Sequence, residues 1–360
     1  MSLSVGIVGL PNVGKSTLFN ALLERQTALA ANYPFATIEP NVGVVPVPDD
    51  RLPQLAKVVN TSKIVPATVE FYDIAGLVKG ASEGAGLGNK FLAHIRETNV
   101  IAHVLRVFAD ENILREGSVD PASDYQIIET ELQLADLATL EKQTEPKGKV
   151  DADISKRWNK IQQWKELLNT GHSLRDSLTL EDDQLIAKEL ALLTAKPQII
   201  VANVSETDLN QASDVIERLA TELNLPASQI VIISAKLEEE LAEVASEEKT
   251  MFLHEYGQEK TGLEAFIRQA YLTLGLQSFY TAGEKEARAW TINQGTTAQN
   301  AAGVIHTDFA KKFISAQVVD FADFIAVGGW KSAREQGKMR QEGRGYIMQA
   351  DDVVEFMIGR

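Results

Sequence analysis

The fold of this chain is indicated by one short segment, Gly9-Leu10-Pro11-Asn12-Val13-Gly14-Lys15-Ser16. It fits the pattern G-x-x-x-x-G-K-[ST], a glycine-rich loop whose backbone N–H groups surround phosphate oxygens. Residues 3–8 before the loop predict a buried strand, and residues 17–23 after it predict a helix. A strand, this loop and then a helix form the arrangement that phosphate binding requires, which makes the match specific.

The loop predicts a role for several of its side chains. The positive end of the following helix points at the phosphates, and Lys15 reaches the β- and γ-phosphates as a catalytic group. The Ser16 hydroxyl is a ligand for Mg²⁺. We therefore predict a nucleotide-phosphate site made of Asn12, Val13, Gly14, Lys15, Ser16 and Thr17.

Two further segments predict contacts to Mg²⁺ and the γ-phosphate. Asp73 ends the apolar run 68–72, where P-loop enzymes hold Mg²⁺ through water, and the Gly76 N–H is a predicted catalytic contact to the γ-phosphate. Thr37 lies between the loop and Asp73, so its hydroxyl is another predicted metal ligand. The five glycines from Gly76 to Gly88 predict either a floppy loop or a switch that orders on the γ-phosphate.

The order of the apolar runs predicts an α/β fold. Helical patterns separate most of the strand-like runs, which lie at residues 3–8, 42–47, 68–72, 100–107, 198–202 and 229–233. Such alternation favours a mainly parallel sheet that is covered on both faces. Between residues 129 and 196 the apolar residues keep a helical spacing, and Pro146-Lys147-Gly148 interrupts them, so we expect an inserted, coiled-coil-like helical hairpin.

Beyond residue 275 helix and strand patterns mix without regular alternation, so we expect a small α+β domain. Its expected strands lie at residues 279–280, 288–292, 314–319 and 346–348, with a helix at 297–304. The predicted domains are a nucleotide-binding G domain at 1–128 and 197–275, a helical insert at 129–196, and a C-terminal domain at 276–360.

The composition of the 360 residues excludes several classes of protein. Lys and Arg number 35 against 50 Asp and Glu, and the net charge of −15 excludes bulk attraction to phosphate polymers. The absence of cysteine excludes disulfides, a thiol nucleophile and Cys-bound metal clusters. No apolar run reaches the ~18–20 residues of a membrane-spanning helix, and the first nine residues lack signal-peptide features. We therefore expect a cytoplasmic protein.

Two more strand ends predict the base-binding site. Asn203-Val204-Ser205-Glu206 follows the run 198–202, and Ser234-Ala235-Lys236 follows the run 229–233. GTPases of this fold carry Asn-Lys-x-Asp and Ser-Ala-Lys at these two strand ends. The predicted base contacts are therefore Asn203, Val204, Glu206, Ser234, Ala235 and Lys236.

The sequence resembles the YchF family of Obg-like ATPases along essentially its whole length. The resemblance rests on residues 11–17, residues 32–41, the Asn203-x-x-Glu206 signature, the helical insert and the C-terminal tail. That tail looks like a TGS domain, a small ubiquitin-like β-grasp module. Because relatives in this family associate with ribosomes, the resemblance implies a ribosome or RNA partner.

The variant base motif favours adenine over guanine. In Asn-Lys-x-Asp the carboxylate accepts hydrogen bonds from N1–H and the 2-amino group of guanine. Here the carboxylate belongs to Glu206, one methylene longer and displaced, and Val204 replaces the Lys whose stem covers the base. A donor or acceptor left unpaired costs about 1–3 kcal/mol, so the chemistry and the resemblance both predict ATP over GTP. The alternative is a relaxed site that takes either purine.

Leu77 stands where Ras-like enzymes carry the Gln that orients the attacking water, and leucine cannot bond water. One substitute is K⁺, for which Asn12 is a candidate ligand and catalytic group, as in related K⁺-activated enzymes. Family members often carry a His in the loop 109–124, but this chain has Leu114-Arg115-Glu116 there. Arg115 is either a charge supplied in cis or a solvated surface residue. We expect slow intrinsic hydrolysis.

Two basic segments predict a polyanionic partner. Residues 142–160 hold six basic and three acidic side chains, and residues 327–346 hold five and two, with Trp330 and Tyr346 available for base stacking. Either segment alone is equally consistent with an ordinary solvated face. Together with the resemblance, they predict ribosome or RNA contact through the insert and the C-terminal domain.

These observations predict a Mg²⁺-dependent purine-nucleotide hydrolase that prefers ATP and acts as a molecular switch. The alternative is a nucleotide-gated ribosome-binding module in which hydrolysis is incidental. A small-molecule kinase is disfavoured because the sequence carries switch and base motifs and no Arg-rich lid.

Overall fold

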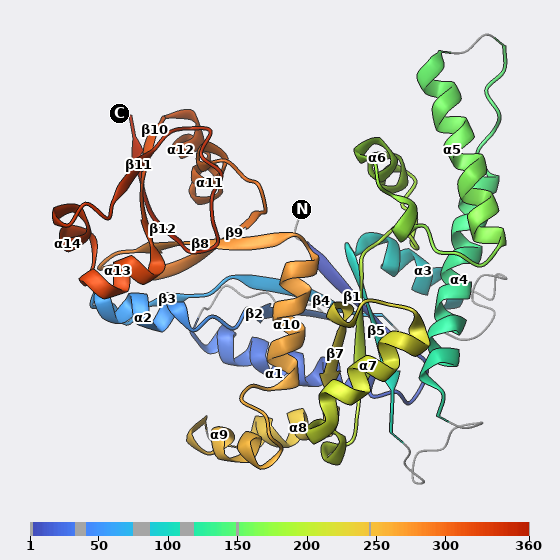
Figure 1. The fold of residues 1–360 in the computed structure, drawn as a ribbon, viewed down its shortest axis with the longest axis horizontal. Coiled ribbons are helices and arrows are strands. Elements are labelled where there is room, and N and C mark those ends of the chain that lie inside the picture. The colour runs from blue at the N-terminus through green and yellow to red at the C-terminus, as the bar shows by residue number, and fades with distance from the viewer. Residues whose placement is uncertain are drawn as a thin grey trace. The chain divides into compact units, whose positions relative to one another are not determined.

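The computed structural model describes residues 3–32, 41–74, 87–108, 119–148, 151–244 and 246–359. The chain forms two compact units, and each contains one six-stranded sheet (Figure 1). The first unit comprises Met1–Val44 and Glu70–Ala270, and the second comprises Val45–Val69 and Tyr271–Arg360. The division into three domains predicted from the sequence remains a proposal.

The sheet of the first unit has the strand order β2-β4-β1-β5-β6-β7. Its strands are β1 (Ser4–Val8), β2 (Val42–Pro46), β4 (Thr68–Asp73), β5 (Val100–Arg106), β6 (Gln198–Asn203) and β7 (Ile230–Ile233). The pairs β1–β4, β1–β5, β5–β6 and β6–β7 are parallel. The predicted α/β fold with a mainly parallel sheet is confirmed, and the motif-bearing strand ends meet at one edge of this sheet.

Helices cover both faces of this sheet, as its buried strands require. They are α1 (Lys15–Asn32), α3 (Leu87–Glu97), α4 (Pro121–Glu141), α7 (Ala212–Leu223), α8 (Ala235–Glu243), α9 (Ser246–Glu255) and α10 (Gly262–Thr273). Tyr72 packs against the cluster that α3 and α4 form with β1 and β5. Its neighbour Phe71 points to the opposite face, where its ring centroid lies 5.2 Å from that of Phe266 on α10.

The predicted helical hairpin is present as α4 and α5 (Ala152–Asn169), followed by the short α6 (Glu181–Glu189). Asp120 caps α4 by accepting a hydrogen bond from the Ser123 N–H at 2.9 Å, and Pro121 occupies the first turn. The hairpin has a small core of its own, in which Leu140 of α4 packs with Trp164 and Leu168 of α5. These apolar contacts hold the two helices together.

The sheet of the second unit has the order β11-β10-β12-β8-β9-β3. Its strands are β3 (Ile64–Val65), β8 (Leu276–Ala282), β9 (Ala287–Asn293), β10 (Phe313–Asp320), β11 (Arg340–Glu342) and β12 (Asp352–Ile358). Its helices are α2 (Arg51–Val58), α11 (Ala298–Ile305), α12 (Thr307–Lys311), α13 (Phe321–Val327) and α14 (Trp330–Glu335). The predicted mixture of helix and strand is confirmed here.

The prediction of a strand at residues 346–348 is wrong. Only Ile347 forms an isolated bridge, to Thr297, and the last strand is β12. The carboxylate of Asp352 explains the difference, because it accepts the Gln349 N–H at 2.8 Å and the Tyr346 hydroxyl at 3.0 Å. These bonds turn the chain just before β12 begins.

Residues 45–69 are part of the second unit although they lie early in the chain. β3 pairs in parallel with β9, placing Ile64 opposite Ala287. The Tyr280 hydroxyl of β8 donates a hydrogen bond to Asp49, and the Arg51 guanidinium lies 2.6 Å from the carboxylate of Asp351. The sequence pattern gave no indication of this arrangement, because nothing in residues 45–69 identifies their partners.

Candidate nucleotide-binding site

The glycine-rich loop joins β1 to α1 and has the backbone that its sequence demands. Gly14 has a φ of +95°, and a Cβ atom there would lie 2.2 Å from Nδ2 of Asn203. Asn12 also has a positive φ, +63°. At Gly9 a Cβ would lie 2.8 Å from Val13 and 3.0 Å from the carbonyl oxygen of Val104. The glycines therefore permit both the turn and its close packing.

Lys15 begins α1, and its side chain points to the end of β4. Its ammonium group forms an ion pair with the carboxylate of Asp73, and the two side chains are 10% and 20% exposed. Ser16 is exposed beside Lys15 at the start of the helix, and Thr17 is half-buried. The structure thus brings together Lys15 and Asp73, which are 58 residues apart in sequence.

Asn203 connects the glycine-rich loop to the loop after β7. Its Nδ2 donates to the Val13 carbonyl at 2.9 Å, and its Oδ1 accepts the Ala235 N–H at 3.0 Å. Because the residue is only 4% exposed, these bonds are well shielded from water. Sequence reasoning predicted a base contact for Asn203 but missed this connecting role, which a single sequence does not reveal.

The other predicted base residues have different environments. Val204 is buried in the core formed by β6, β7 and α7, so its side chain is part of the packing. Ser234 caps α8 by accepting the Leu237 N–H at 3.4 Å. Glu206 begins the short η3 helix (Glu206–Gln211), and its Oε1 lies 2.9 Å from Nζ of Lys236. This pairing raises the pKa of Lys236.

Some sequence-predicted residues lie outside the part of the chain that the structure describes. They are Thr37, Gly76, Leu77, Leu114 and Arg115. Their roles stay predictions.

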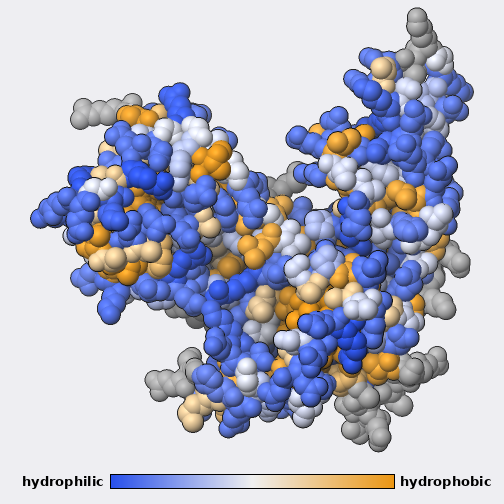
Figure 2. Space-filling view, viewed as in Figure 1, coloured by the Kyte–Doolittle hydropathy of each residue, from blue (hydrophilic) through white to orange (hydrophobic). Residues whose placement is uncertain are grey.

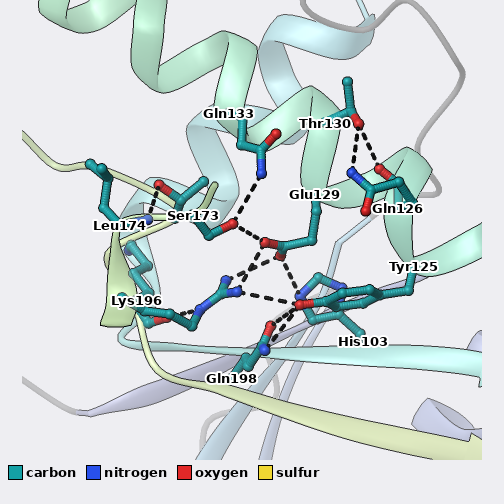
Figure 3. Close-up of polar contacts among 12 residues, drawn as sticks. His103, Tyr125, Gln126, Glu129, Thr130, Gln133, Ser173, Leu174, Lys196 and Gln198 are labelled. Atoms are coloured by element: carbon teal, nitrogen blue, oxygen red, sulfur yellow. Dashed lines mark hydrogen bonds and ion pairs between the residues drawn. The ribbon is translucent and has the colours of Figure 1, made fainter. Parts of the chain in front are cut away.

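A second polar cluster lies inside the first unit, where α4 meets β5 and the end of the insert (Figure 3). The buried Arg175 of the short η2 helix (Arg175–Ser177) donates two hydrogen bonds to Glu129 of α4, at 2.9 and 3.1 Å. Ser173 also donates to Glu129, and His103 of β5 lies 3.5 Å from the same carboxylate. Burial alone would raise the pKa of Glu129, but the positive charge and hydrogen bonds of Arg175 outweigh it and lower that pKa. Burial lowers the pKa of His103 to about 4.

This cluster fixes the insert to the sheet by buried charge, because an unpaired Glu129 or Arg175 would be strongly destabilising there. Sequence reasoning missed it. The sequence signal was weak, because it consists only of a histidine in the middle of a largely apolar strand and a glutamate on the apolar side of a helical pattern.

The described residues contain neither a membrane-spanning helix nor a preformed cluster of metal-binding side chains. Among them, no helix combines the length and apolar character needed to cross a membrane. The same residues include no cluster of three or more His, Cys, Asp or Glu side chains that could hold a metal ion by themselves.

The parallel sheet, the loop between β1 and α1, and the Lys15–Asp73 pair define a P-loop nucleoside triphosphate hydrolase with the motif order of a GTPase domain. Residues 4–124 match a family profile described as a 50S ribosome-binding GTPase. Residues 276–359 match the profile YchF-GTPase_C, described as a protein of unknown function.

Whole-chain relatives extend this comparison. "Ribosome-binding ATPase YchF" of Bacillus subtilis is 46% identical over 363 residues, covering 99% of each chain, and the protein of that name from Escherichia coli O157:H7 is 47% identical over 365 residues with the same coverage. The solved "Structure of the Schizosaccharomyces pombe YchF GTPase" matches with a TM-score of 0.87 and 35% identity, covering 99% of this chain and 98% of that chain. This chain belongs to the YchF family.

Proposed function

We propose that this protein is a Mg²⁺-dependent hydrolase that prefers ATP to GTP and acts as a nucleotide-controlled switch on the ribosome. The observation that carries the proposal is the convergence of Lys15 and Asp73 beside the glycine-rich loop. An ammonium group that here pairs with a carboxylate is available to phosphate oxygens when a nucleotide binds. The names of the relatives support the ATPase and ribosome-binding parts.

The residues present fit a Mg²⁺ ion. Ser16 offers an exposed hydroxyl at the start of α1, and Asp73 offers a carboxylate at the end of β4. Mg²⁺ prefers oxygen ligands and is commonly held by one or two protein groups together with substrate phosphates. Bound there, the ion would neutralise charge on the β- and γ-phosphates. We propose Ser16 and Asp73 as ligands of this Mg²⁺ ion, with Thr37 as a further ligand.

Each part of the loop does a separate task in this proposal. The backbone N–H groups of residues 12–17 bind the phosphates, and Lys15 stabilises the negative charge that develops between them. Asn203 keeps the loop at a fixed distance from the 234–236 segment, because it bonds to both. Gly76 completes the γ-phosphate contact, and Asn12 is the proposed K⁺ ligand. A difference in turnover between K⁺ and Na⁺ buffers would test that last assignment.

The proposed ribosome contact uses the insert and the C-terminal unit. Figure 2 shows that the surface over α5 is mainly hydrophilic. Part of its positive charge is neutralised, because Arg157 pairs with Glu189 at 2.6 Å and Lys160 with Asp183 at 2.8 Å. Lys142 and Lys147 are exposed and available to phosphate groups. A protein that binds ribosomes works where they are, so we propose a cytoplasmic location.

The decisive experiment measures phosphate release from ATP with Mg²⁺ by purified wild type and Lys15→Ala. We expect the variant to lose turnover, since the phosphate-binding cation is gone. Lys188→Ala, an exposed lysine of α6, is the matched control and should hydrolyse ATP like the wild type. Normal turnover by Lys15→Ala would disprove the proposal.

A second measurement separates the switch from the alternative of a binding module with incidental hydrolysis. Sedimentation with ribosomes is compared in ATP, a non-hydrolysable ATP analogue and ADP. A switch requires that the complex formed with ATP is released after hydrolysis but persists with the analogue. Equal release with ATP and the analogue would favour the module.

A further inference from the structure

The ion pair between Lys236 and Glu206 makes the two carboxylate oxygens of Glu206 unequal. Nζ of Lys236 lies 2.9 Å from Oε1 of Glu206. That oxygen is shielded from solvent, although the Glu206 side chain as a whole is 24% exposed. One acceptor of the carboxylate is therefore covered and already engaged by a cation.

The two purines need different numbers of acceptors from such a carboxylate. An ionised carboxylate only accepts hydrogen bonds. Guanine presents two neighbouring donors, N1–H and the 2-amino group, and a carboxylate reads both by giving one oxygen to each. On the corresponding edge of the base, adenine presents only its 6-amino group as a donor, because its N1 carries a lone pair instead of a hydrogen. A carboxylate with one available oxygen therefore suits adenine and leaves one guanine donor unpaired.

We propose that Lys236 is a specificity-determining residue, which selects adenine over guanine by occupying one of the two oxygens of Glu206. The inference rests on the proposed nucleotide-hydrolase function and adds the residue that controls its choice of base. Lys236 acts through Glu206, so it is a positioning residue.

The surroundings of Lys236 favour this role. Its Nζ also lies 3.7 Å from a carboxylate oxygen of Glu240, one turn further along α8, so the ammonium is placed between two acidic groups. Within the two base-motif segments, 203–206 and 234–236, Lys236 is the one cation. Val204 fills the position of the usual base-covering lysine and is buried in the core.

The test is a titration of wild type and Lys236→Met with ATP, GTP and inosine triphosphate in the presence of Mg²⁺. Methionine keeps an unbranched stem without the charge, so it frees Oε1 of Glu206. We expect the ratio of the GTP Kd to the ATP Kd to fall about tenfold, as one added hydrogen bond to a charged group would produce. Inosine triphosphate lacks the 2-amino group, so its Kd should improve less than that of GTP.

Two further variants isolate the route of the effect. In a Glu206→Gln background the Lys236→Met change should not alter the ratio, because the amide has one acceptor oxygen whether or not a lysine is near. Glu240→Gln is the control on the other side of Lys236 and should keep the wild-type ratio within twofold. Lys236 is 70% exposed, so thermal melting should confirm that its variant folds.

The outcomes separate this inference from the function on which it rests. An unchanged ratio in Lys236→Met, with ATP still bound, overturns the inference and leaves the proposed function in place. A fall in the ratio that persists in the Glu206→Gln background also overturns it, because the effect would not pass through Glu206. Failure of the wild type to bind either nucleotide overturns the proposed function and the inference together.

Discussion

Replacing Arg175 with alanine should strongly destabilise the first unit. Arg175 gives Glu129 two hydrogen bonds, and the two side chains are only 10% and 3% exposed. Without Arg175 the carboxylate stays buried with Ser173 and the neutral His103 as its neighbours. Breaking a buried pair by removing one partner costs about 3–5 kcal/mol. At roughly 2–4 °C per kcal/mol for a unit of this size, the midpoint of thermal unfolding should fall by about 6–20 °C.

The assay is thermal unfolding followed by circular dichroism at pH 7, and the chain supplies a matched control. Arg157 makes the same two-bond contact with Glu189, at 2.6 and 2.9 Å, but these side chains are 34% and 62% exposed. Water and salt screen that pair, so Arg157→Ala should hardly move the midpoint. If Arg175→Ala lowers the midpoint no more than Arg157→Ala does, burial is not what makes the Glu129 pair important, and the reasoning is refuted.

Three other predictions follow from the structure. Gly14→Ala should abolish ATP binding in a fluorescence titration because its Cβ would meet Asn203, whereas Gly171→Ala, with a φ of +79° and no neighbour within 4 Å, should bind normally. Burial lowers the pKa of His103 from 6.5 to about 4, so the unfolded chain binds the extra proton between these values and stability rises with pH across that window. The free energy of unfolding should rise by about 3 kcal/mol across this window. Urea unfolding at several pH values should show this rise in the wild type but not in His103→Gln. Trp164→Ala removes a side chain only 1% exposed and should cost about 3–5 kcal/mol; hydrogen exchange in α5 that matches the wild type would contradict this.

The strands and the phosphate loop of the first unit could be predicted well, because the sequence patterns that indicate them lie within short segments. The loop 9–16 needs particular residues for its backbone, so the sequence reveals both the strand before it and the helix after it. The strands β4, β6 and β7, which end at Asp73, Asn203 and Ile233, could be located for the same reason, since each is a mainly apolar run followed by polar residues.

Pairings between distant segments could not be predicted in this way. Nothing local to Glu129 indicates that Arg175 is its partner, and nothing near Glu206 indicates that Lys236 covers one of its oxygens. The wrong strand at 346–348 has a similar origin. Its apolar residues fit a strand, but the carboxylate of Asp352 takes the hydrogen bonds that turn the chain.

The inclusion of residues 45–69 in the second unit has a consequence for how the chain is made. This segment leaves the ribosome before its partners in β8 and β9, which begin only after residue 270. At about 5–20 residues per second, translation of the intervening stretch takes on the order of 10–40 s. During that time Leu52 and Leu55, the apolar face of α2, have no sheet to cover them. The second unit is therefore completed only after its later strands have been made, although it also needs the much earlier segment 45–69.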